Sequence, residues 1–200
     1  MTWKRVEPIS SGTASPPLVA DVQRHLTRRE FAYYGGFQDP VTQIHECSHG
    51  INAKLRNSTR ERDNWFYCLN NTAAGFSEPP CRKRDIASST PREFREHRLY
   101  ALYILGASDW EDTPLYIYDE WVCYSNGAML RRSASEIEYA LVFAFYALAL
   151  LRVARTKQYT QLTDLSLFFI WNMARLEQVA EGQERLVSLL QEKANDQLDL

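Results

Sequence analysis

The sequence predicts an α+β fold that is mostly α-helical, with a small antiparallel sheet. Several segments have the length and apolar content of helices, above all Ser135 to Lys157, which is nearly all apolar from Tyr139 to Leu151. Asn64 to Leu69 and Ala73 to Ser77 are strand-like and flank Asn70-Asn71-Thr72, a typical turn sequence, so they predict a β-hairpin. Separate helices together with one hairpin give the α+β class.

The length and composition favour a single domain over residues 1–200. Of these residues, 45% are hydrophobic, which is enough for one core. Residues 1–17 are rich in Ser, Pro and Gly and predict an extended N-terminal arm. At the other end, residues 134–195 predict a group of C-terminal helices.

The elements before the hairpin follow from local signals. Leu18 to Arg28 predicts a short helix, and Glu30 to Tyr34 predicts a strand that ends at Gly35-Gly36. Asp39-Pro40 predicts the start of a longer helix, because Asp is a good N-cap and Pro fits the first turn. We expect this helix to continue to Leu55 or Arg56.

The elements after the hairpin begin with a polar loop that contains Arg82, Lys83 and Arg84. Thr90-Pro91-Arg92-Glu93 has a capping-box pattern and predicts a helix to about Leu105. Another helix is expected from about Glu120 to Arg131, although Tyr116-Ile117-Tyr118 before it also has the pattern of a short strand.

The C-terminal helices are the two longest segments of helical pattern. We expect one helix over Ser135 to Lys157 and a second helical region over Thr163 to Leu190, interrupted near Gly182. The apolar stretch in the first is short for a bilayer and is bounded by charged residues, which predicts a buried helix.

One motif in the chain specifies a chemistry by residue type and spacing, His45-Glu46-Cys47-Ser48-His49. Residues four apart share one face of a helix, so the two imidazoles can bind the same Zn²⁺ ion. Glu46, next to the first histidine, can accept a proton from a zinc-bound water. The alternative is a surface helix with two unrelated histidines. No other charge lies between Val41 and Asn52, which suits a helix in the protein interior.

With its flanking residues, the motif resembles the metal helix of the zincin metallopeptidases. Thr42 stands three residues before the first histidine and Ile51 two residues after the second, as in the extended zincin pattern. The resemblance covers about a dozen residues. It implies a zincin-like domain, a zinc cofactor and peptidase activity. It also implies that an edge strand, here the hairpin, holds an extended peptide substrate.

Glu120 is the candidate for the third metal ligand. It lies in an otherwise apolar segment, where a carboxylate is costly unless it is paired or bound to a metal. His97 and His25 are weaker candidates, because charged residues flank them. Glutamate-type zincins take their third ligand from a helix after the HExxH motif, and Glu120 resembles that ligand.

The zincin subfamily stays open, because the chain departs from both longer patterns. Several glutamate-type zincins have Asp four residues after the ligand, where this chain has Tyr124. The histidine-type pattern HExxHxxGxxH fails because Asn52 and Leu55 stand at its Gly and third His.

Four further residues are assigned provisional roles around the metal. Asp119 either holds a histidine Nδ1–H or is a helix N-cap. Tyr124 either donates to the oxyanion as a catalytic residue or is an interior tyrosine. Asn52 and Arg56 continue the helix face of the histidines, where they contact substrate or hold the residues behind the ligands. For Arg56, a salt bridge at the helix end is the alternative.

The sequence thus predicts a zinc-dependent hydrolase that cleaves a peptide or other amide bond, with Glu46 as general base. One alternative is a 2-His-1-carboxylate metalloenzyme that uses Fe(II), and another is a non-catalytic helical binding protein. The substrate and the oligomeric state are left open.

Charge and cysteine usage bear on partners and location. The net charge of −2, without a basic stripe, argues against a nucleic-acid partner. The N-terminus has no signal-peptide pattern, and no segment is expected to cross a membrane, so we expect a cytoplasmic protein. The four cysteines form no CxxC pair and are expected to be reduced thiols.

Overall fold

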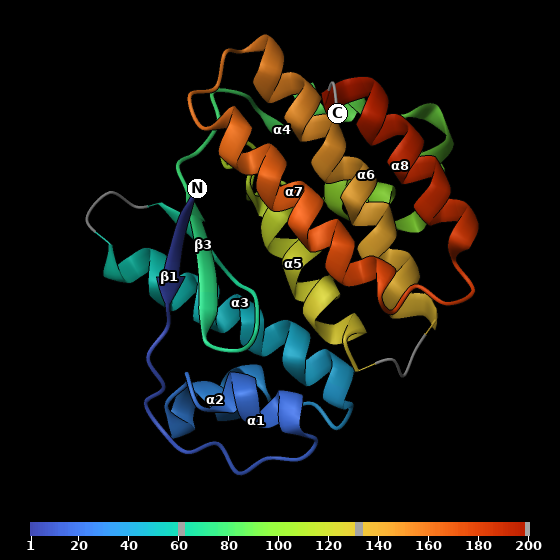
Figure 1. The fold of residues 1–200 in the computed structure, drawn as a ribbon. Helices are drawn as coiled ribbons and strands as arrows, with labels where there is room; N and C mark the ends of the chain where they lie inside the picture. Colours follow the sequence, from blue (N-terminus) through green and yellow to red (C-terminus); the bar gives the residue numbers. More distant parts are fainter. Residues whose placement is uncertain (60–62, 131–133, 199–200) are drawn as a thin grey trace.

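The structure is a computed structural model that describes residues 1–59, 63–130 and 134–198. The chain is 62% helix and 7% strand, which confirms the predicted mostly helical α+β class. Figure 1 shows a small sheet with three helices in one part of the molecule, α1 (Pro17–Gln23), α2 (Arg28–Tyr34) and α3 (Pro40–Ser58). The other part is a helical bundle of α5 (Tyr116–Ala128), α6 (Ala134–Thr156), α7 (Leu162–Glu177) and α8 (Glu184–Leu198).

The sheet has three antiparallel strands in the order β1-β3-β2. The predicted hairpin is present as β2 (Asn64–Tyr67) and β3 (Thr72–Phe76). Its connection passes through Leu69, Asn70 and Asn71 with φ values of 66°, 51° and 62°. Asn tolerates this left-handed conformation better than most residues, which is why the Asn-Asn pair marks the turn.

The third strand, β1 (Thr2–Arg5), was not predicted. It lies within residues 1–17, which were expected to form only an extended arm, and it pairs with β3 so that Thr2 is opposite Gly75. Its side chains are mostly exposed, so the segment lacks the alternation of a half-buried strand. Pairing with a partner about 70 residues away in the chain leaves no local signal.

The sheet is buried between two hydrophobic clusters because successive side chains point to opposite faces. On one face, Phe66 and Phe76 contact Phe168 of α7, with ring centroids 6.0 and 5.4 Å apart. On the other face, Trp65 and Tyr67 belong to the cluster that includes the apolar residues of α1 and α3. The sheet therefore joins the two parts of the fold.

Two short helices precede the HExxH motif, α1 (Pro17–Gln23) and α2 (Arg28–Tyr34). The prediction of a strand over Glu30 to Tyr34 is wrong. Thr27 and Glu30 form a capping box, in which Glu30 N donates to Thr27 Oγ1 and Thr27 N donates to Glu30 Oε2. This capping box stabilises a helix start that the β-like composition concealed.

Helix α3 (Pro40–Ser58) carries the HExxH motif and begins where it was predicted. Asp39 is its N-cap and accepts a hydrogen bond from Thr42 N at 2.9 Å. The helix packs against α1, α2, β2 and α5.

The segment between the hairpin and α5 differs from its prediction. Residues expected in a polar loop form α4 (Lys83–Ser89), and the expected helix from Thr90 to Leu105 is instead a 3-10 turn (Arg92–Phe94) followed by a π-helix (Tyr100–Gly106). Thr90 does not cap a new helix. Its hydroxyl donates to Ile86 O at 2.9 Å and so closes α4.

Helix α5 (Tyr116–Ala128) starts one turn earlier than predicted, so the alternative of a strand at Tyr116-Ile117-Tyr118 is wrong. The predicted end at Arg131 lies outside the described residues. A side chain at Gly127 would approach Val41 to 3.1 Å, so glycine here allows close packing of α5 against α3.

After α5, the bundle continues with α6 (Ala134–Thr156), α7 (Leu162–Glu177) and α8 (Glu184–Leu198). The predicted interruption near Gly182 is confirmed, and Gly182 has a left-handed φ of 81°. Helix α6 contacts α4, α5, α7 and α8 and is the central helix of the bundle (Figure 1). In the described part of the chain it alone has the length and hydropathy of a membrane span, but 83% of that window is buried inside the protein.

Candidate metal centre

His45 and His49 face α5 from the middle of α3. Because they are one helical turn apart, their rings are neighbours, with centroids 4.8 Å apart and Nε2 atoms 3.1 Å apart. His45 is 9% exposed and His49 is only partly buried. The two histidines therefore share one face of α3, as the motif predicted, and this face is largely buried.

The tertiary fold brings Glu120 of α5 to these two histidines. Glu120 Oε2 lies 3.6 Å from His45 Nε2, and Glu120 Oε1 lies 3.6 Å from His49 Nε2. The three candidate ligand atoms all lie within 4.8 Å of one another. Among the described residues, neither His25 nor His97 belongs to this group.

The donor set fits a zinc ion. Two imidazole nitrogens and one carboxylate are a known ligand set for catalytic zinc, with the fourth position left for water. Glu120 is buried, and its Oε2 atom has no hydrogen-bond partner in the described chain. A buried carboxylate oxygen without a partner is costly, and a cation between the three side chains would remove this cost.

Asp119 contacts the His49 ring nitrogen that faces away from Glu120. Its Oδ2 atom lies 2.9 Å from His49 Nδ1, which directs the opposite nitrogen, Nε2, toward Glu120. Histidine ligands of metals usually donate their second nitrogen to a carboxylate in this way. Asp119 lies within α5, in its first turn, so the alternative of a helix N-cap is wrong.

Asn52 links Asp119 to strand β2 of the sheet. Its amide nitrogen donates to Asp119 Oδ1, and its oxygen accepts from Tyr67 N at 2.6 Å. Both ends of the side chain are thereby used within the protein. Of the two roles predicted for Asn52, the contacts favour holding Asp119 in place over contacting substrate.

The same interactions limit the predicted use of β2 as a substrate-binding edge. Tyr67 N is bonded to Asn52, and Tyr67 O accepts from Asn126 Nδ2 at 2.7 Å. Side chains of α3 and α5 therefore occupy the edge at Tyr67, and an extended peptide cannot pair with the strand at that residue.

Three tyrosine hydroxyls lie around the candidate ligands. Tyr124 packs edge-on against His45, with ring centroids 4.3 Å apart, and its hydroxyl is 3.2 Å from that of Tyr103 in the π-helix. Tyr116 donates to Glu120 Oε1 at 2.6 Å. Burial raises the pKa of each of the three hydroxyls, and Glu120 raises them further, so they remain protonated donors.

Tyr103 and Tyr116 were not predicted as site residues. Tyr116 is four residues before Glu120 and so lies on the same helix face, a signal that was missed because α5 was expected to begin at Glu120. Tyr103 reaches the site only through the π-helix, and the sequence gives no signal for it.

Glu46 is partly buried, and no hydrogen bond of its side chain is recorded within the described residues. Burial raises the pKa of its carboxyl, and the Glu120 charge raises it further, while His49 lowers it. A raised pKa makes a carboxylate a better proton acceptor at neutral pH.

The two histidines differ in their electrostatic surroundings. Burial lowers the pKa of His45, and the neighbouring His49 lowers it further. Burial also acts to lower the pKa of His49, but the adjacent Cys123 and Asp119 outweigh it, so this pKa lies well above the usual range. Cys123 is itself fully buried, and burial raises the pKa of its thiol.

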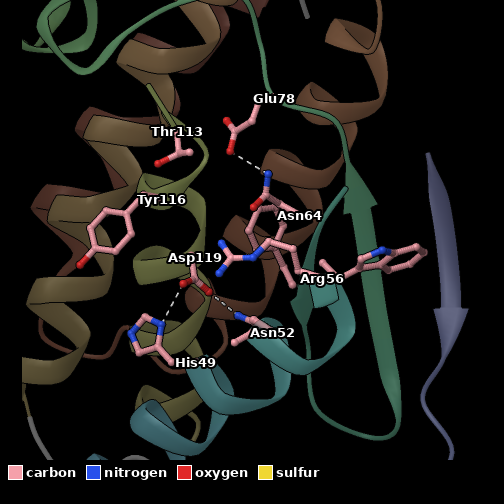
Figure 2. A pocket seen from close by; sticks show the side chains of 11 residues that line it. His49, Asn52, Arg56, Asn64, Glu78, Thr113, Tyr116 and Asp119 are labelled. Carbon is pink, nitrogen blue, oxygen red and sulfur yellow. Dashed lines mark hydrogen bonds and ion pairs between the residues drawn. The ribbon is translucent and has the colours of Figure 1, made fainter. Parts of the chain in front are cut away.

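A small pocket of about 60 Å³ adjoins the centre on the side of His49 (Figure 2). Residues of α3, of β2, and of the segments before and within α5 line it. They are His49, Asn52, Ala53, Arg56, Asn64, Trp65, Phe66, Glu78, Thr113, Tyr116 and Asp119. Arg56 thus lies on the helix face that was predicted for it, and its charge acts to lower the pKa of the Glu78 carboxyl across the pocket.

The remaining histidines and the cysteines lie elsewhere or have other contacts. His25 is buried against Tyr67, and His97 lies 3.5 Å from Glu138. All four cysteines are free and buried, as expected for reduced thiols.

Comparisons with known proteins add no relatives: no protein-family model, curated protein or solved structure matches the chain.

Proposed function

We propose that this protein is a zinc-dependent hydrolase that cleaves a peptide or other amide bond. The observation that carries the proposal is the convergence of His45, His49 and Glu120 from two helices, with His49 held by Asp119. A carboxylate at Glu46, directly beside the first ligand, supplies the base that such a reaction needs. The likeness of the motif to zincin metallopeptidases supports the same reading.

In the proposed reaction, His45, His49 and Glu120 would hold Zn²⁺, and a zinc ion bound there would supply Lewis-acid activation of water and of the substrate carbonyl. Glu46 accepts the proton of the attacking water and delivers it to the leaving amine. Asp119 keeps the His49 ring in the tautomer that binds metal through Nε2. The Tyr124 hydroxyl, supported by Tyr103, donates to the oxyanion.

The first test is the metal content of protein purified without added metal. We expect about one zinc ion per chain. Stoichiometric iron without zinc would favour the 2-His-1-carboxylate oxygen chemistry instead. Replacement of Glu120 by Ala should weaken metal binding, because it removes one of three ligands.

The second test separates catalysis from binding. Glu46→Gln should retain the metal and lose about 10²- to 10⁴-fold in turnover of a peptide-library substrate, because it removes the general base but no ligand. Glu96→Gln, which changes an exposed glutamate in the same way, is the matched control. Undiminished hydrolysis by Glu46→Gln would contradict the proposed mechanism, and metal binding without any hydrolysis would favour a non-catalytic binding protein.

A further inference from the structure

The pocket beside the candidate metal centre is placed to hold a part of the substrate. His49 and Tyr116 both line this pocket, and the Tyr116 hydroxyl donates a hydrogen bond to Glu120. A group seated there is therefore next to His49, and it is separated from Glu120 by the Tyr116 side chain. The volume of about 60 Å³ is small and suits a group of a few heavy atoms, not a large side chain.

The two carboxylates that line the pocket are already satisfied by the protein. Asp119 accepts from Asn52 and is bonded to His49. Glu78 accepts from Asn64 Nδ2 at 2.7 Å and from Leu115 N at 3.1 Å, and burial raises its pKa. Neither carboxylate has an oxygen left without a hydrogen bond.

Arg56 also lines this pocket, and its charge acts to lower the pKa of the nearby Glu78 carboxyl. It lies two helical turns after His49, and Figure 2 shows its guanidinium extending between Asp119 and Asn64. Within the described residues, no ion pair or hydrogen bond of this guanidinium is recorded. Its planar set of N–H donors matches the two oxygens of a carboxylate.

We propose that this pocket binds a carboxylate of the substrate and that Arg56 recognises it. The enzyme would then favour amides with a free carboxylate close to the scissile bond, such as the C-terminal residue of a peptide or an N-acyl amino acid. A monoanion fits better than phosphate, because the lining carboxylates Asp119 and Glu78 repel a singly charged group less than a doubly charged one. The choice of substrate class rests on the proposed hydrolase function.

A binding experiment tests the pocket independently of catalysis. It uses the metal-free full-length protein, so that a carboxylate cannot bind through zinc, and compares N-acetylglycine with N-acetylglycinamide by ligand-observed NMR. We expect the acid to bind at least about 10-fold more tightly than the amide, and Arg56→Met to remove this difference. Arg152→Met, which removes an exposed arginine from α6, is the matched control and should retain it. Equal binding of acid and amide by the unaltered protein would overturn the proposal.

An activity experiment tests the substrate class. Zinc-loaded protein is given peptides that differ only in a free or amidated C-terminus, and release of the last residue is followed by mass spectrometry. We expect kcat/KM to be at least about 10-fold higher for the free acid, and this ratio to fall to near 1 in Arg56→Met.

The two proposals fail in different ways. Hydrolysis that depends on Glu46 but does not distinguish the two C-termini would refute carboxylate recognition and leave the hydrolase proposal intact. Absence of any Glu46-dependent hydrolysis would contradict the hydrolase proposal, while the metal-free binding experiment would still decide whether Arg56 binds a carboxylate.

Discussion

At the residue scale, Asp119 holds one of the three candidate ligands, His49, in position, although it is not itself a member of that group. It contacts His49 on one side and Asn52 on the other, and Asn52 in turn holds the backbone of Tyr67. This chain of contacts fixes the position of His49 relative to both α5 and the sheet.

We predict that Asp119→Ala lowers zinc affinity about 10- to 100-fold, because His49 loses the partner that orients its ring. Competition with a chromogenic chelator measures the affinity. Asp109→Ala, which removes an exposed aspartate just before α5, should leave it unchanged. Unaltered affinity in Asp119→Ala would mean that the His49 orientation does not depend on this carboxylate.

His25 makes stability depend on pH away from the metal centre. It is 2% exposed, and burial lowers its pKa below the usual value, although the Asp21 charge and hydrogen bonds with the Glu7 backbone and Asn71 act to raise it. The folded state thus favours neutral His25. Below about pH 6.5 the unfolded chain binds the proton more readily, so the free energy of unfolding falls as the pH falls.

The expected loss in the free energy of unfolding from His25 is at most about 1.4 kcal/mol per pH unit below pH 6.5. Urea unfolding of metal-free protein at pH 7.5 and pH 5.5 measures it. In His25→Phe, which keeps a ring against Tyr67, the difference between the two pH values should be smaller than in the unaltered protein. An equal difference in both proteins would show that His25 does not contribute.

At the element scale, local signals predicted the helices that carry the site but not all of their neighbours. Asp39-Pro40 placed the start of α3 correctly, because capping acts within a few residues. The same kind of signal gave a wrong prediction at Thr90. Its hydroxyl donates to the end of α4 and does not cap the start of a new helix. Strand β1 escaped prediction because its partner is remote in sequence.

The packing of α2 on α3 depends on Gly50, which follows the second histidine of the motif. A Cβ at Gly50 would lie 2.6 Å from the Tyr34 ring, closer than van der Waals contact allows. We predict that Gly50→Ala destabilises the protein, although Ala in a helix interior usually adds about 0.5–1 kcal/mol over Gly.

The companion substitution makes this prediction specific to Tyr34. In a Tyr34→Ala background the ring is absent, so Gly50→Ala should raise the free energy of unfolding, as helix propensity predicts. Urea unfolding of the four proteins gives the coupling between the two sites. Additive effects would show that the Tyr34 ring moves away at little cost.

At the scale of the whole molecule, the candidate ligands link the two parts of the fold. His45 and His49 belong to α3, beside the sheet, and Glu120 belongs to α5, the first helix of the bundle (Figure 1). Bound zinc would connect these helices and stabilise the folded state over the unfolded chain.

We therefore predict a rise in the thermal midpoint when zinc is added and a fall when a chelator removes it. Zinc at 1,000 times its Kd adds about 4 kcal/mol, which corresponds to roughly 10 °C for a chain of this size. Differential scanning fluorimetry measures the shift. Mg²⁺ should have little effect, since it prefers oxygen ligands, and Glu120→Ala should reduce the zinc shift.

The sequence alone determined the helical class, the hairpin, and the helix that presents His45, Glu46 and His49 on neighbouring positions, because helix periodicity and turn preference act over a few residues. It also selected Glu120, since a carboxylate in an apolar segment is costly without a partner. Only the tertiary structure decided that Glu120 lies 3.6 Å from both histidines, that Asp119 holds His49, and that Arg56, Tyr103 and Tyr116 surround the centre. These contacts join side chains that are far apart in the chain, or depend on where a helix starts, and local patterns carry no information on either.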